Sequence, residues 1–590
     1  MEAVTSLLKA LGSFFVGLGA SFGSFLGTLQ FAPIYGSILR FAFPILAIII
    51  LSRCARSLLT FKKEPEVWAW LLLPSGDRLP VTHWENIIGR AKNCDLMVEY
   101  PTVSRNHAVL TRYDDGSWTI SDVGSKGGVE VNGEKTQICA LHYGDTFSLG
   151  GVDFNLVPIT EEQESIQASE RTRAGREIRP GTTLFYLTLF QILAALQLML
   201  NVDAKDVSEV GAAFVGLMAM EWLLFWSMKA IRRTGYEVES IAFFLTTIGL
   251  SVVASSRPAA LSKQLVCVLI GIVVFLFIGW SLRNLERAKK IRYLATAAGI
   301  GLLAINLIFG TEQYGAKNWI FIGGMSFQPS ELVKLCFIYA GASTMDRLVT
   351  KRNLFLFILY SGFICGCLAL MNDFGTALIF FVAFLVIAYL RSGDFATLSL
   401  ICAGTGFAGV MVLRFRPYIK SRFASWGHVW SDALGAGFQQ TRAMMCIASG
   451  GLLGLGVGCG WLKYVAAADT DLVFAFVSEE WGLLVAMTMV LCIVCLSVFV
   501  VRSANVGRST FYTIGACAAV SILMMQTLLN VFGTVDFLPL TGVTFPFVSN
   551  GGSSMISAWG LLAFVKACDT RQNASFAIKL PSRKKEAEET

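Results

Sequence analysis

Long apolar segments separated by short polar ones recur along most of the chain. Most of them run for roughly 17 to 22 residues, which is long enough for a helix to cross about 30 Å of hydrocarbon. The pattern predicts about thirteen such helices, at residues 34–52, 182–200, 209–230, 238–255, 264–282, 292–310, 330–346, 354–371, 376–391, 396–414, 472–501, 510–531 and 553–567. The predicted fold class is a polytopic α-helical membrane protein.

The composition agrees with this class. The chain is 54% hydrophobic and 15% charged, and its mean hydropathy is +0.61, which is unlike soluble globular proteins. Its 14 cysteines lie mostly inside apolar segments and show neither metal-ligand spacing nor a secreted-domain framework, so we expect small apolar side chains. Residues 1–30 lack the basic start and cleavage site of a secretory signal. They are expected to form an exported or membrane-lying tail.

Basic residues gather in alternate short loops. Four of them, Arg53, Arg56, Lys62 and Lys63, follow the first predicted helix, and further clusters lie at residues 232–233, 283–292, 347–352, 502–508 and 583–585. Cytoplasmic loops of membrane proteins carry an excess of Lys and Arg. With thirteen helices all these clusters fall on one side, which predicts that residues 66–158 and the C-terminus are cytoplasmic.

Residues 66–158 show short runs of alternating apolar and polar residues between turns rich in Gly, Asn and Asp, which predicts a small β-sandwich. Three pieces lie on its predicted loops: Gly89-Arg90, Ser104-Arg105-Asn106-His107 and Gly124-Ser125-Lys126-Gly127-Gly128. In order and spacing these pieces resemble the forkhead-associated (FHA) domain, a reader of phosphothreonine.

The resemblance implies a phosphothreonine site on these loops. Arg90 and Ser104 would hold the phosphate, with Arg105 and Lys126 as further members of the site and His107 as a buttress. Arginine and hydroxyl groups suit a phosphate because they give directed, charge-assisted hydrogen bonds. Where FHA domains usually have a Thr-Asn pair, this chain has Lys126 and Gly127, so a sandwich that serves as a docking module without a phosphate requirement stays open.

Polar residues also mark two ends of the apolar segments. Glu331 and Lys334 are three residues apart at the start of a predicted helix, where they can neutralise each other at the membrane edge. Asp373 is placed to cap the helix that follows it. Roles in shaping a cavity or binding a substrate stay open beside these structural ones.

Asp471 lies at the mouth of an apolar helix that is predicted to continue through Trp481 into the membrane. An ionisable group at such a place is costly, so it is a candidate for function. The long loop before it, residues 415–470, is predicted on the outer face yet is basic, which suggests an anionic ligand such as the diphosphate of a lipid carrier. The alternative is an amphipathic loop anchored on acidic headgroups.

Seven separated motifs occur in the order seen in the SEDS family of FtsW, RodA and SpoVE, which this chain resembles. They are Gly315 to Trp319, Gln328 to Glu331, Asp373 to Thr376, Ser449-Gly450-Gly451 with the glycines that follow, Lys463, Thr470-Asp471 with Glu479 to Gly482, and Pro539 to Ser554. The ordered set is far more specific than any one motif.

The resemblance implies a ten-helix core and a peptidoglycan glycosyltransferase that polymerises lipid II at the outer face of the bacterial plasma membrane. Asp471 matches the family's essential aspartate, the base that would deprotonate the 4-hydroxyl of the acceptor sugar. Three basic residues, Lys463, Arg422 and Arg442, would steady the leaving diphosphate. The rest of the predicted substrate-binding set is Glu331, Lys334, Asp373 and Ser549.

A divalent cation, Mg²⁺ or Mn²⁺, is the one cofactor that we expect, with Asp469 and Asp471 as candidate ligands; no organic cofactor and no nucleic-acid partner are expected. The expected partners are lipid II, a class B penicillin-binding protein, membrane lipids and a phosphothreonine protein such as a Ser/Thr kinase substrate. Two other functions stay open. A lipid II translocator would still move lipid after Asp471→Asn, and an idle division or elongation scaffold would depend on Arg90 instead.

These patterns divide the chain into six parts. They are residues 1–60, a tail and the first helix; 66–158, the cytoplasmic FHA-like sandwich; 159–181, a flexible polar linker; 182–235, two additional transmembrane helices; 237–570, the glycosyltransferase core; and 571–590, a basic cytoplasmic tail.

Overall fold

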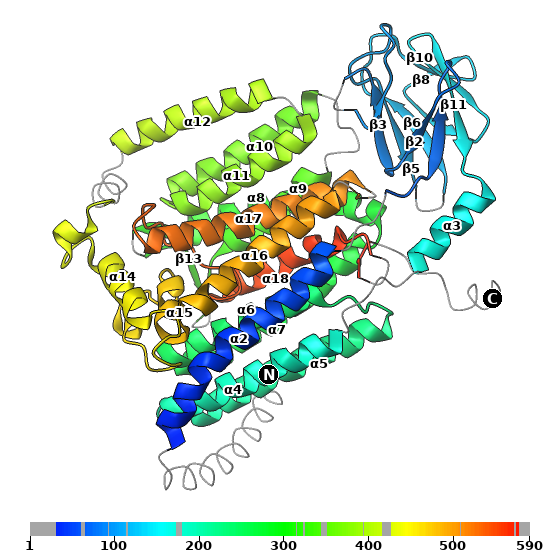
Figure 1. Ribbon diagram of the computed structural model, residues 1–590. Coiled ribbons are helices and arrows are strands. Elements are labelled where there is room, and N and C mark those ends of the chain that lie inside the picture. Colours follow the sequence, from blue (N-terminus) through cyan, green and yellow to red (C-terminus); the bar gives the residue numbers. More distant parts are fainter. Residues whose placement is uncertain are drawn as a thin grey trace.

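The computed structural model has a β-sandwich at one end of a bundle of long helices (Figure 1). It describes residues 31–60, 65–91, 94–113, 116–172, 180–313, 315–322, 325–343, 351–392, 395–415, 426–504, 506–507, 509–571 and 574–577. The predicted fold class is confirmed, because many apolar helices and an inserted sandwich are present.

Eleven short strands form the sandwich in the described part of residues 69–158. One sheet has the strand order β2-β1-β11-β10-β7-β8 and the other β4-β3-β5-β6-β9. The strands are β1 (Ala69–Leu72), β2 (Arg78–Val81), β3 (Glu85–Gly89), β4 (Leu96–Met97), β5 (Ala108–Arg112), β6 (Trp118–Asp122), β7 (Val129–Val131), β8 (Glu134–Thr136), β9 (Ile138–Leu141), β10 (Thr146–Leu149) and β11 (Val152–Pro158). The β3–β4 pair is parallel.

Alternate side chains of these strands fill the space between the two sheets. Trp118 and Ile120 of β6 are buried, and so is Phe154 of β11. Phe154 pairs with Phe147 of β10 across the ladder, and their rings stack with centroids 5.8 Å apart. This period of two is the signal that predicts the sandwich from the sequence.

The rest of the described chain is mainly helical. Its helices are α2 (Phe31–Thr60), α3 (Glu161–Thr172), α4 (Pro180–Asn201), α5 (Val207–Ala230), α6 (Glu237–Ser256), α7 (Leu261–Leu282), α8 (Leu285–Phe309), α9 (Pro329–Ser343), α10 (Lys351–Leu370), α11 (Phe374–Ser392), α12 (Phe395–Phe415), α14 (Phe438–Gly450), α15 (Val473–Trp481), α16 (Leu483–Ala504), α17 (Thr510–Thr534) and α18 (Gly552–Ala567). Within the described ranges, 8 helices are long and apolar enough to cross a membrane. The number of thirteen spans stays a prediction.

The single helix predicted at residues 472–501 is wrong, because the structure has two helices there. α15 ends at Trp481 and α16 begins at Leu483, with Gly482 between them at φ 87°. A Cβ atom at Gly482 would lie 2.3 Å from the carbonyl oxygen of Leu452, so the chain turns there against another backbone segment. Apolar residues continue across the break, and the hydropathy pattern therefore does not reveal it.

Two segments predicted as irregular contain helices. The linker at 159–181 holds α3, whose first turn carries Glu161, Glu162 and Glu164, and acidic residues there are favoured by the helix dipole. The outer loop at 415–470 holds α14 and two short 3-10 turns. A small sheet of β12 (Thr311–Gln313), β13 (Ala316–Ile322) and β14 (Met325–Phe327) also joins α8 to α9.

Helices α2, α4 and α5 pack along one side of the bundle (Figure 1). Gln191 of α4 donates to Glu221 of α5 at 2.6 Å, and both side chains are buried. The neighbouring residue of α4, Phe190, stacks its ring on Trp481 of α15 with centroids 5.3 Å apart. Helix α4 is therefore held to α5 by a buried hydrogen bond and to α15 by aromatic packing.

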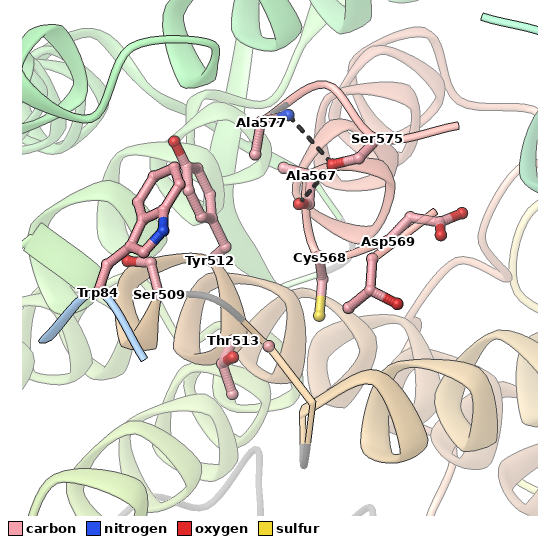
Figure 2. A pocket seen from close by; sticks show the side chains of 11 residues that line it. Trp84, Ser509, Tyr512, Thr513, Ala567, Cys568, Asp569, Ser575 and Ala577 are labelled. Carbon is pink, nitrogen blue, oxygen red and sulfur yellow. Dashed lines mark hydrogen bonds between the residues drawn. The ribbon is translucent and has the colours of Figure 1, made fainter. Parts of the chain in front are cut away.

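The sandwich contacts the bundle through the start of β3. Trp84 lies with Ser509 and Tyr512 at one side of a small pocket, and Asp569 lies at the other side (Figure 2). Ser509 Oγ donates to Glu85 Oε2 at 3.2 Å. Trp84 also belongs to the same apolar core as the helices, so this contact is a packed interface.

Helix α17 connects this contact to the opposite end of the bundle. Ser509 precedes its first residue, and Asn530 lies in its last turns. About 30 Å of helix separates the two positions, which is the hydrocarbon thickness of a bilayer. α14 and α15 lie at the end of the bundle away from the sandwich (Figure 1).

Candidate functional sites

Asp471 lies directly before α15, as predicted. The chain turns at Ala467, which has φ 58°, and the N–H groups of Thr470 and Asp471 both donate to its carbonyl oxygen, at 3.2 and 2.9 Å. Leu472 then leads into the helix. A tight turn therefore aims the Asp471 side chain, which is partly exposed.

Two buried polar side chains hydrogen-bond to the backbone of this turn. Asn530 Nδ2 donates to the carbonyl oxygen of Asp471 at 3.0 Å and to that of Val543 at 2.9 Å. Ser549 Oγ donates to the carbonyl oxygen of Thr470 at 2.6 Å. Predicted as a substrate-binding residue, Ser549 is buried here and fixes the turn.

The Asp471 carboxylate lies beside Gly542. A Cβ atom at position 542 would be 3.3 Å from Asp471 Oδ2, and the glycine has φ 70°. Gly542 itself is exposed. The carboxylate thus lies next to a stretch of backbone without a side chain, at the surface of the bundle end.

Asp469 has different surroundings from Asp471. Its Oδ2 accepts a hydrogen bond from Asn550 Nδ2 at 2.7 Å and lies 3.4 Å from Arg257 Nε. The Asn550 N–H also donates to the Asp469 carbonyl oxygen at 2.8 Å. In the part of the chain that the structure describes, no three His, Cys, Asp or Glu side chains gather as metal ligands.

A glycine-rich loop before Asp471, residues 454–462, is held in place by two buried glutamates at the end of α15. Glu480 accepts from the N–H groups of Gly458 and Gly460 at 3.0 and 3.3 Å. Glu479 accepts from the N–H of Leu462 at 2.8 Å. Backbone donors thus hydrogen-bond to both carboxyl groups, which explains how two adjacent acidic side chains can be buried.

The predicted diphosphate-binding cations are spread over this region. Lys463 Nζ donates to the carbonyl oxygen of Gly458 at 3.0 Å. Arg442 lies on α14, with its guanidinium over the ring of Phe438 at 5.2 Å. Arg422 lies outside the described residues, so its position relative to Asp471 stays a prediction.

The predicted pair and the predicted cap at the starts of α9 and α11 are both present. Lys334 Nζ lies 2.7 Å from Glu331 Oε1, and both side chains are buried. Asp373 Oδ1 accepts from the N–H of Thr376 at 3.1 Å, and its Oδ2 accepts from Asn318 Nδ2 at 2.8 Å.

The loop after α17 brings Asp373 and Asp471 into one region. A Cβ atom at Gly375 would contact Val543 at 2.8 Å, and the Val543 carbonyl oxygen shares the side chain of Asn530 with Asp471. Motifs far apart in the sequence therefore meet around residues 541–543.

The candidate phosphothreonine loops of the sandwich also come together. Ser104 Oγ accepts from the N–H of Lys126 at 3.0 Å. His107 is buried; its Nδ1 accepts from the Ser104 N–H at 3.0 Å, and its Nε2 lies 2.9 Å from the carbonyl oxygen of Gly128. His107 thus buttresses both loops, as predicted, while Arg90 and Arg105 are exposed beside them.

Packing explains the glycine at position 127. A Cβ atom there would lie 2.6 Å from the Cα atom of Gly150. An asparagine at this position would require the two loops to separate, so Gly127 belongs to a closer loop packing.

Residues 239–574 match the model of the FtsW, RodA and SpoVE family, described as cell cycle proteins. The match covers more than half of the chain. This chain belongs to the FtsW/RodA/SpoVE family. Residues 86–150 match the FHA domain. The helices α2, α4 and α5 lie outside both matches, as additions to the family's core.

Three similar proteins illustrate the relationship. Peptidoglycan glycosyltransferase RodA of Mycobacterium tuberculosis is 28% identical over 65% of this chain and 88% of that protein. The probable peptidoglycan glycosyltransferase FtsW of Nitrosococcus halophilus is 30% identical over 52% of this chain and 82% of that protein. A chain of a solved peptidoglycan synthase complex is 24% identical over 56% of this chain and 96% of that chain, with a TM-score of 0.47.

Sequence reasoning missed several residues that build the site. Asn530 and Arg257 lie beside the two aspartates only because the fold brings them there. Gly542 belongs to the predicted motif Pro539 to Ser554, but the motif does not predict its place beside Asp471. An asparagine within an apolar helix is a signal for Asn530, because a buried amide needs partners. Adjacent glutamates in an apolar run are a similar signal for the pair that holds the glycine-rich loop.

Proposed function

We propose that this chain polymerises lipid II into the glycan strands of peptidoglycan. The observation that carries the proposal is the placement of Asp471, whose partly exposed carboxylate lies on a turn fixed by Asn530 and Ser549. Membership of the family supports the same reaction, since its relatives in mycobacteria and in Nitrosococcus are named as glycosyltransferases of peptidoglycan.

In the proposed step, Asp471 takes the proton of the acceptor sugar's 4-hydroxyl. That oxygen bonds to C1 of the donor sugar, while the bond between C1 and the diphosphate oxygen breaks and the lipid diphosphate leaves. A carboxylate can act as this base only within hydrogen-bond reach of the hydroxyl. Lys463, Arg442 and Arg422 meet the negative charge of the leaving group, which positive side chains stabilise best when held in place beforehand.

A resident Mg²⁺ or Mn²⁺ fits the described donors poorly. Asp469 is already paired with Asn550 and Arg257, and an octahedral cation needs several oxygen ligands around it. The proposed reaction therefore relies on the chain's own groups. Whether chelation of divalent cations stops polymerisation is the direct test of that cofactor.

We place the sandwich in the cytoplasm and Asp471 at the outer face. The length of α17 between Ser509 and Asn530 supports opposite faces of a bilayer. Basic residues at the same end of the bundle support the cytoplasmic assignment. Arg233 and Arg571 lie close to Asp569, and Asp569 lines the pocket beside the sandwich.

We propose that the sandwich binds a phosphothreonine in a kinase substrate through Arg90, Ser104, Arg105 and Lys126. The Ser104 hydroxyl supports this role, because it accepts from the Lys126 N–H and can still donate its own hydrogen. A class B penicillin-binding protein is the proposed partner of the helical part, because new glycan strands need an enzyme that crosslinks them.

The experiment is polymerisation of labelled lipid II by the purified full-length chain in proteoliposomes, with and without candidate class B penicillin-binding proteins. Glycan ladders on gels are the expected result. Movement of lipid II between leaflets without chain growth would favour a translocator, and the absence of both activities in a folded, partner-bound preparation would favour a scaffold.

A further inference from the structure

A basic cavity lies between the C-terminal ends of α5 and α7. Its volume is about 740 Å³. Lys229, Arg232 and Arg233 line it from the end of α5 and the following loop, and Arg283 lines it from the end of α7. No acidic residue is among its lining residues in the described chain.

Two of the cations of this cavity, Arg233 and Arg283, are close enough to affect each other. Arg233 is buried, and burial, followed by the nearby charge of Arg283, lowers its pKa to about 10, while Asp569 acts in the opposite direction. Arg233 is still protonated at neutral pH. An anion that enters the cavity would therefore relieve the repulsion between like charges.

The cavity also has an apolar wall. Phe576 packs against α7 so closely that a Cβ atom at Gly279 would lie 2.7 Å from its ring. Trp226 and Trp280 are exposed on α5 and α7, and Lys229 Nζ lies 4.8 Å from the centre of the Trp226 ring. Exposed tryptophans beside basic residues are typical of the boundary between lipid and water.

We propose that this cavity binds the headgroup phosphate of an anionic phospholipid, with the acyl chains along the exposed apolar faces of α5 and α7. The basic lining matches the phosphate, and the apolar wall matches the start of the chains. A soluble phosphate would use only the basic lining, whereas a phospholipid uses both the basic lining and the apolar wall.

The position of the site gives the lipid a structural role. α5 lies outside the family match and α7 lies inside it. A lipid bound between them joins the added helices to the family's core. The inference does not depend on the proposed polymerase activity.

The test uses the detergent-solubilised full-length chain and measures lipid retained by native mass spectrometry. Phosphatidylglycerol and phosphatidylcholine serve as probes. We expect Lys229→Gln/Arg283→Gln to bind phosphatidylglycerol about tenfold more weakly than wild type, while Lys229→Arg/Arg283→Lys keeps binding within about twofold, since charge–phosphate contacts supply the affinity.

The matched control is Arg56→Gln/Lys290→Gln, which removes the same charge from exposed positions outside the cavity. The site would be overturned if the two glutamine double variants lost phosphatidylglycerol binding equally, or if neither lost it. It would also be overturned if the wild type retained phosphatidylcholine as well as phosphatidylglycerol. Competition by inorganic phosphate at the same concentration as the lipid would overturn the lipid as the ligand and assign the cavity to a soluble anion.

Discussion

Asp471 and Gly542 belong to segments about seventy residues apart, and they meet because Asn530 binds the backbone on both sides of that contact. The carboxylate that we propose as the base is thus positioned by residues to which we assign no catalytic role. At the scale of the residue, this arrangement predicts that a position without a side chain matters for activity.

Gly542→Ala is expected to lower polymerisation by about tenfold or more, because even small displacements of a catalytic group are costly. The new Cβ atom would lie 3.3 Å from Asp471 Oδ2, at a positive φ that alanine rarely adopts. The measurement is the rate of ladder formation. Gly533→Ala is the control, since its Cβ atom would make only ordinary contacts, at 3.5 Å or more; equal rates for both variants would contradict the account.

Arg90→Ala and Ser104→Ala are expected to weaken binding of phosphothreonine peptides by at least about tenfold, because each removes one charge-assisted hydrogen bond worth about 1.5–3 kcal/mol. Calorimetry with a peptide library and the isolated residues 66–158 gives the affinity, after circular dichroism has verified that the piece folds. The exposed Lys135→Ala in β8 is the control. Unchanged affinity in both loop variants would leave the sandwich as a docking module.

At the scale of the element, α15 belongs to the family's core and packs against two of the added helices, α2 and α4. Trp481 at its end contacts Phe43 of α2 and Phe190 of α4, with centroids 4.6 and 5.3 Å away. In the same region, Asn201 of α4 donates to the carbonyl oxygen of Val457 at 2.6 Å. The added helices therefore support the glycine-rich loop that precedes Asp471.

Trp481→Ala is expected to cost about 3–5 kcal/mol, because it leaves a large cavity among three helices. A lower melting temperature in detergent and faster hydrogen exchange at residues 454–462 are the expected readouts. Trp461→Ala, at an exposed position, should shift neither. An equal effect of the two changes would show that the packing around Trp481 is not special.

The sequence predicts elements better than their breaks. The Glu331–Lys334 pair and the Asp373 cap follow from spacing along one helix, and both are present. The break at Gly482 and the helix α14 depend on backbone contacts between distant segments. Hydropathy does not reveal such contacts, because the sequence is apolar on both sides of Gly482 and mixed around α14.

At the scale of the whole molecule, the two candidate sites lie at opposite ends of one bundle. α2 precedes the sandwich in the sequence and ends at Thr60, while Arg40 in its first half donates to the carbonyl oxygen of Leu455 in the glycine-rich loop. α17 spans the same length from Ser509 to Asn530. In the described part of the chain, α17 thus runs from the contact with the sandwich to the surroundings of Asp471, and α2 reaches the glycine-rich loop from the segment that precedes the sandwich.

Trp84→Ala is expected to release the sandwich from the bundle without unfolding it, because Trp84 packs against the helices at the edge of the sandwich. Faster hydrogen exchange at residues 509–513, with unchanged protection of β5 and β6, is the expected result. Ile138→Ala, exposed on the same sandwich, is the control. Loss of protection throughout the sandwich would contradict a separable interface.

The central claim is that Asp471 is the base of a lipid II polymerase. The most direct test compares wild type, Asp471→Asn and Asp536→Asn in proteoliposomes, with ladder formation and lipid II binding measured together. Asp536 is a matched control, because it is a partly exposed aspartate that follows α17 at the same end of the bundle. The account predicts that Asp471→Asn lowers the rate by at least about a hundredfold, keeps lipid II binding and differs from Asp536→Asn. Polymerisation by Asp471→Asn at more than a tenth of the wild-type rate would contradict it.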